Sequence, residues 1–139
     1  MSTTFQRSEI WRLTSVEAAA QIPDHSLDFV YVDARHDYES VLEDLDAWFP
    51  KVRGGGIFAG HDYADGLFVQ GEFGVKSAVD EFFAARGIPV HSTDGPSAVE
   101  MFPSWIVEVP PAAAVDLPLA QAPPDEGHAP VVADRAGAR

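Results

Sequence analysis

The stretch FVYVDARHDYESV, residues Phe29–Val41, carries an apolar run directly into a cluster of charged side chains. Residues 26–32, SLDFVYV, are almost continuously apolar, which is typical of a strand with both faces covered. Apolar side chains then recur from Tyr38 to Phe49 at the spacing of one helix face. The stretch therefore predicts a strand that ends at Asp33, followed after a short loop by a helix.

The same alternation of strand and helix continues on both sides of this stretch. Thr14 with Glu17 three residues later forms a capping box, which predicts a helix starting there. Further strands are expected at residues 9–13, 56–60, 88–92 and 104–109, and a further helix over residues 75–83. Strands alternating with helices indicate an α/β fold with a mainly parallel sheet.

The composition of the 139 residues changes after residue 109. Residues 110–139 are rich in Ala and Pro and contain no aromatic side chain, so they cannot bury enough apolar surface to offset the entropy of ordering. We therefore expect one domain over residues 1–109 and a disordered tail without functional residues over 110–139.

Charge and cysteine content exclude several classes of function. The formal net charge of −13 argues against a nucleic-acid partner, because phosphate binding needs clustered Lys and Arg. Without cysteine there are no thiolate zinc sites, disulfides or Cys nucleophiles. No apolar run approaches the roughly 20 residues of a membrane span, and no secretory signal is visible. These features predict a cytoplasmic protein with no membrane partner.

Two carboxylates follow successive strands of the predicted sheet. Asp33 ends the first strand, and Asp62 follows the strand GIFAG within the tripeptide HDY. Ligands of open α/β sheets bind outside the carboxyl ends of the strands, so neighbouring strands would bring both carboxylates into one crevice. Two such oxygen ligands suit Mg²⁺ or a similar cation. His36, one turn past Asp33, is suited to act as a general base there.

Simpler interpretations remain open at several positions. Asp37 can cap the following helix while Asp33 merely ends a strand, and the spacing alone does not choose between the two interpretations. The glycines of RGGG, Arg53–Gly56, precede a strand, whereas a phosphate-binding loop must follow one. We expect them to end the helix and turn the chain. Thr14 and Ser15 are expected to be helix caps.

The segment SLDFVYVDARHDYESVLEDLDAWFPKVRGGGIFAGHDY, with FGVKSAVDEFF and PSWIVEV after it, resembles class I S-adenosylmethionine-dependent methyltransferases. The similarity covers roughly residues 9–109 and is strongest to the branch that includes the macrocin-type sugar O-methyltransferases. Its most specific parts are VDARHDYE and GHDY. The resemblance implies methyl transfer from S-adenosylmethionine to the hydroxyl oxygen of a small-molecule acceptor.

The resemblance also implies a role for individual residues. Asp33 and Asp62 match the carboxylates that hold the metal, with Asp33 also beside the cofactor. His36 matches the position of the base. Ser15 and Val16 fall where the family places residues against the adenine. The implied chemistry is metal-assisted, with Mg²⁺ lowering the pKa of the acceptor hydroxyl.

The chain departs from the family pattern because it resembles the C-terminal half only. The first strand, its glycine-rich loop and the second strand with its ribose-binding acid have no counterpart. The implied fold is thus a partial Rossmann-like sheet, mostly parallel with an antiparallel last strand and lacking the first two strands of the order 3-2-1-4-5-7-6. We expect weak or no S-adenosylmethionine binding by the chain alone, and self-association through the exposed edge of the strand LDFVYV. The alternative function is a non-catalytic remnant that serves as a binding or oligomerisation module.

Overall fold

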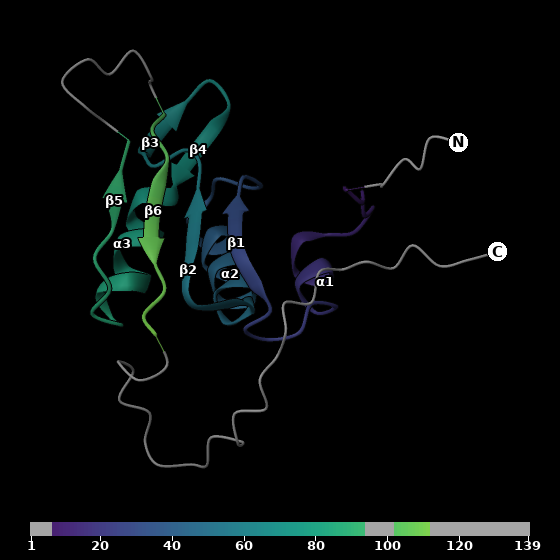
Figure 1. Ribbon diagram of the computed structural model, residues 1–139. Helices are drawn as coiled ribbons and strands as arrows, with labels where there is room; N and C mark the ends of the chain where they lie inside the picture. The colour runs from purple at the N-terminus through teal and green to yellow at the C-terminus, as the bar shows by residue number, and fades with distance from the viewer. Residues whose placement is uncertain (1–6, 94–101, 112–139) are drawn as a thin grey trace.

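A four-stranded sheet with two helices packed on one face forms the body of the protein (Figure 1). The structure, a computed structural model, describes residues 7–93 and 102–111. The strands lie in the order β1 (Leu27–Val32), β2 (Val52–Gly60), β6 (Trp105–Glu108) and β5 (His91–Ser92). β1 and β2 are parallel, and β6 is antiparallel to both of its neighbours. The mostly parallel α/β sheet with an antiparallel last strand is therefore confirmed. The observed strand order, β1-β2-β6-β5, corresponds to the strand order 4-5-7-6 within the family order that the resemblance implies.

The core lies between this sheet and the helices α2 (Tyr38–Trp48) and α3 (Val75–Ala84), which also pack against each other. Phe58 on β2 and its partner Val107 on β6 are fully buried against the helices. Trp105 packs edge-on against Phe58, with 5.3 Å between the ring centroids. The opposite face of the sheet is open at β1, where the side chains of Phe29 and Tyr31 remain exposed.

Side-chain caps fix the starts of the first two helices. Asp37 accepts a hydrogen bond from the backbone N–H of Ser40 and so caps α2, as one of the two open interpretations had it. Thr14 caps α1 (Ser15–Ala19), and Glu17 completes the predicted capping box. Ser15 is the first helical residue and not a cap, because Thr14 already occupies that position.

Two predictions about regular structure are wrong. Residues 9–13 form no strand, and their side chains are exposed, because no strand of the described residues lies beside them to complete a hydrogen-bonded ladder. Residues 53–56 do not end α2, whose last turn passes into a 3₁₀ helix at Phe49–Lys51. They lie inside β2, where Leu27 pairs with Val52 and Phe29 with Ile57, so four residues of β2 oppose a single residue of β1. Glycine permits this bulge, and Gly55 takes a φ of 77°.

A short hairpin that the sequence pattern does not predict joins β2 to α3. It consists of β3 (Asp65–Phe68) and β4 (Gly71–Gly74) and lies at the end of the sheet to which β1 and β2 point (Figure 1). Leu67 and Val69 are exposed, so this segment lacks the alternation of buried and exposed residues that identifies strands.

Candidate functional site

The carboxyl ends of β1 and β2 lie side by side, as their parallel pairing requires. Val32 pairs with Gly60, and the N–H of His61 donates to the carbonyl of Val32 at 3.0 Å. Asp33 and Asp62 thus leave the sheet at the same edge, as expected from the sequence. One ligand atom each from Asp33, His61 and Asp62 lies within 4.8 Å of the others. We call these three residues the carboxylate–histidine cluster.

The backbone at Asp62 is left-handed, with φ 57°, and the residue is buried. On either side the chain is fixed by hydrogen bonds, because the N–H of Tyr63 donates to Pro103 at 2.8 Å and that of His61 to Val32. In an extended strand, consecutive side chains point to opposite faces. The left-handed turn instead lets those of His61 and Asp62 meet, with Nδ1 3.0 Å from Oδ1.

His36 contacts the other oxygen of the same carboxylate. Its Nε2 lies 2.9 Å from Oδ2 of Asp62, so the structure brings the predicted base and the predicted metal ligand together. The imidazole stacks on Phe73 of β4, with 4.3 Å between the ring centroids. The backbone carbonyl of His36 accepts a hydrogen bond from the N–H of Gly74. The hairpin therefore fixes the position of His36.

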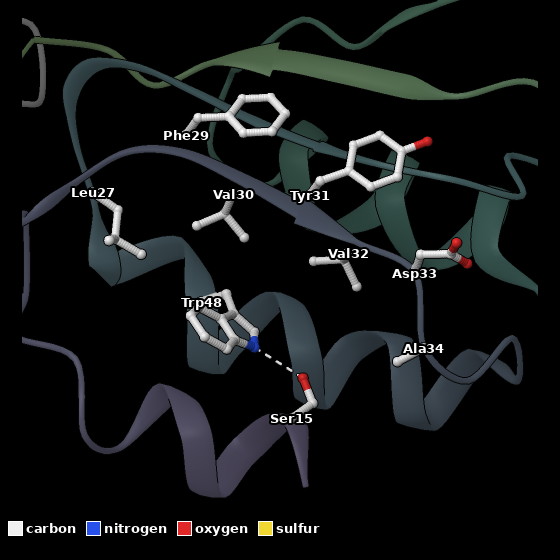
Figure 2. A pocket seen from close by; sticks show the side chains of 9 residues that line it. All are labelled: Ser15, Leu27, Phe29, Val30, Tyr31, Val32, Asp33, Ala34 and Trp48. Atoms are coloured by element: carbon white, nitrogen blue, oxygen red, sulfur yellow. Dashed lines mark hydrogen bonds between the residues drawn. The ribbon is translucent and has the colours of Figure 1, made fainter. Parts of the chain in front are cut away.

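A hollow of about 380 Å³ runs along β1 toward the cluster (Figure 2). Ser15 enters it from α1, and Asp33 stands at the end of β1. Val16 is exposed and does not line the hollow. Of the three residues expected at a cofactor, the structure thus places Ser15 and Asp33 along one hollow. Its lining consists of Ser15, Leu27, Phe29, Val30, Tyr31, Val32, Asp33, Ala34 and Trp48.

The region that contains the hollow and the cluster is similar to known proteins. Residues 3–63 match the family model of a methyltransferase domain. This match supports a methyltransferase family for the chain. An uncharacterised protein of Sinorhizobium fredii (strain NBRC 101917 / NGR234), y4gI, is 38% identical over 55 residues, which is 40% of this chain. The matched segment spans only 6% of the length of that relative.

Within the matched region, Ser15 joins α1 to α2. Its hydroxyl accepts a hydrogen bond of 2.9 Å from Nε1 of Trp48 (Figure 2). Asp44 on α2 is almost completely buried, and this burial raises the pKa of its carboxyl although a hydrogen bond with Ser15 acts in the opposite direction. Ser15 thus has a structural role in docking α1, independent of any cofactor.

The donor set of the carboxylate–histidine cluster fits a divalent cation. Asp33 and Asp62 offer carboxylate oxygens, and His61 offers an imidazole nitrogen. His61 was not predicted as a site residue, although it precedes Asp62 in the tripeptide HDY. The spacing H-D after a strand is the only sequence signal for it.

Hydrogen bonds on α3 hold the chain that follows Asp62. The hydroxyl of Tyr63 and the ammonium of Lys76 both donate to Asp80. Burial, and then the hydrogen bond to Asp80, raise the pKa of the Tyr63 hydroxyl, and the same carboxylate raises the pKa of Lys76. Both donors therefore stay protonated at neutral pH and anchor the loop of the site to α3.

Among the helices that the structure describes, none is long and apolar enough to cross a membrane.

Proposed function

We propose that this chain contributes the acceptor-side chemistry of an S-adenosylmethionine-dependent O-methyltransferase of the macrocin-type branch, acting on a small-molecule hydroxyl. The observation that carries the proposal is the methyltransferase match of residues 3–63, because this segment contains the carboxylate–histidine cluster, His36 and the lining of the hollow. The hollow with Ser15 and Asp33 supports a cofactor position beside β1.

The chemistry is a direct substitution at carbon. The acceptor oxygen attacks the methyl group of the sulfonium, the carbon–sulfur bond breaks, and the hydroxyl proton leaves to a base. Asp33 and Asp62 would hold a divalent cation, which would supply positive charge that lowers the pKa of the hydroxyl. His36 takes the proton, and since Asp62 contacts Nε2, Nδ1 is the nitrogen that receives it. Phe73 keeps the imidazole in place during this transfer.

Titration with S-adenosylmethionine followed by NMR tests the cofactor position. We expect weak, millimolar affinity, because the chain offers only one wall of a cofactor site. Amide shifts should change around Ser15, Asp33 and Ala34, which line the hollow, and stay unchanged at Ser92 on β5. Shift changes that are confined to other parts of the chain at high cofactor concentration would contradict the proposed position.

A second function, a binding or oligomerisation module, is favoured by the edge of β1. In the described part of the chain, β1 has β2 on one side and no strand on the other. Phe29 is 56% exposed and Tyr31 43% exposed, and Asp28 is the only charge on the strand. Unprotected apolar edges pair readily with other chains. We therefore propose self-association of the chain through β1.

Substitution of Phe29 by lysine is expected to prevent this self-association. A lysine on an edge strand opposes pairing, although Phe29→Lys also reduces the net charge of −13 and with it the general repulsion between copies. Light scattering after size exclusion should give a dimer or larger species for the wild type and 15.0 kDa for the variant. Val69→Lys, on the exposed tip of the hairpin, is the matched control and should behave as wild type. A wild-type chain that is monomeric would contradict the proposal.

A further inference from the structure

We propose that His61 is the third protein ligand of the carboxylate–histidine cluster, and that it makes the site one for a first-row transition ion such as Mn²⁺ in preference to Mg²⁺. The inference rests on the cation site of the proposed function. It adds a residue to the pair Asp33 and Asp62, and it changes the class of the ion.

The first argument is the distance between His61 and Asp62. Two ligand atoms on neighbouring positions of an octahedral ion, with bonds of about 2.1 Å, lie about 3.0 Å apart. Nδ1 of His61 and Oδ1 of Asp62 are 3.0 Å apart. An ion can therefore take the place of the proton between them without movement of the backbone. Asp33, whose ligand atom lies within 4.8 Å of both, is exposed and free to close the remaining distance by rotation of its side chain.

The second argument is that the two carboxylate oxygens of Asp62 contact different histidines. Oδ2 contacts Nε2 of His36 at 2.9 Å, and Oδ1 contacts His61. With an ion on Oδ1, His36 holds the outer oxygen of a ligating carboxylate, which is a common arrangement around metal sites. The two histidines thus have different roles, His61 on the ion and His36 behind the carboxylate.

The third argument is the chemistry of the donors. Mg²⁺ binds oxygen ligands almost exclusively, whereas an imidazole nitrogen favours transition ions. A set of two carboxylates and one imidazole combines oxygen ligands with a nitrogen ligand, and this combination suits Mn²⁺. The side chain of His61 is 39% exposed and that of Asp62 only 12% exposed, so the ion would be anchored on the buried side and open to solvent on the other. That open side leaves positions for water or an acceptor hydroxyl.

Electron paramagnetic resonance with Mn²⁺ tests the assignment on the full chain. We expect Mn²⁺ binding that only a large excess of Mg²⁺ displaces, with an electron spin echo modulation from a directly bound imidazole ¹⁴N. His61→Gln should remove this modulation and weaken Mn²⁺ binding by at least about tenfold. His36→Gln is the matched control, since His36 contacts the same carboxylate but is not a ligand, and its modulation should persist.

Three results would overturn the inference. Mn²⁺ binding without nitrogen modulation would leave a carboxylate-only site and remove His61 from it, while the cation site itself would stand. Modulation that persists in His61→Gln and disappears in His36→Gln would make His36 the ligand. Absence of Mn²⁺ binding by a folded chain, judged by its circular dichroism, would reject the site altogether, whereas the S-adenosylmethionine titration tests the methyltransferase assignment separately.

Discussion

Replacing Asp62 with asparagine is expected to abolish binding of a divalent ion while the fold remains intact. Asp62 is the buried member of the carboxylate–histidine cluster and contacts both His36 and His61. Asparagine keeps the size of the side chain but removes its charge. It also tolerates the left-handed backbone, which alanine would strain, so Asp62→Asn separates chemistry from folding.

The expected loss of Mn²⁺ affinity is on the order of 100-fold or more, because a charged ligand contributes more than the outer-shell groups whose loss costs 10- to 100-fold. Calorimetric titration gives the affinity, and thermal unfolding without metal confirms the fold. Asp28→Asn removes an equal charge from β1, where the Asp28 carboxylate pairs with Arg53 away from the cluster, and should leave the affinity unchanged. Equal losses in both variants would show that general charge, and not the site, attracts the ion.

The largest expected effect on stability comes from Gly60→Ala. A Cβ at this position would lie 2.6 Å from two ring atoms of Trp105 and 2.6 Å from the carbonyl oxygen of Val32. Neither can move cheaply, because Trp105 is 1% exposed in the core and the Val32 carbonyl accepts the N–H of His61. We expect the free energy of unfolding to fall by about 3 kcal/mol or more.

Urea unfolding measures this change. Gly87→Ala is the control, because its Cβ would meet nothing within 4 Å and only its φ of 66° opposes the substitution. We expect that variant to lose about 1–2 kcal/mol. Similar losses in the two variants would mean that Trp105 yields to the new methyl group, and that the tight contact between β2 and β6 is not a constraint on the site.

Periodicity predicted the elements whose one face is buried. The spacing of apolar residues located α2 and α3, and the nearly continuous apolar run located β1, because each packs against the same core. The convergence of Asp33 and Asp62 also followed from their places after successive parallel strands. Local chemistry was sufficient at Thr14, where the capping box with Glu17 determines the start of a helix.

Other features depend on contacts that the spacing of apolar residues along the sequence does not predict. The hairpin of β3 and β4 has exposed apolar residues, and its role is to support His36 through Phe73. The position of His61 depends on a single backbone angle at Asp62. Residues 9–13 have the composition of a strand, but a strand exists only where another strand pairs with it. Residues 1–6, 94–101 and most of the expected tail lie outside the described residues.

The glycine bulge of β2 has a consequence for insertions and deletions. Four residues of β2 stand opposite one residue of β1, and regular pairing resumes only at Phe29 and Ile57. Gly54 and Gly55 are both exposed. We therefore expect insertions or deletions there to leave the pairing of β1 with β2 unchanged from Phe29 and Ile57 onward, toward the site. Gly56 marks the limit of this tolerance, since a Cβ there would lie 2.9 Å from the carbonyl oxygen of Asp28. A peptide tag or a fluorescent reporter placed between Gly54 and Gly55 should thus leave Asp33 and Asp62 facing each other.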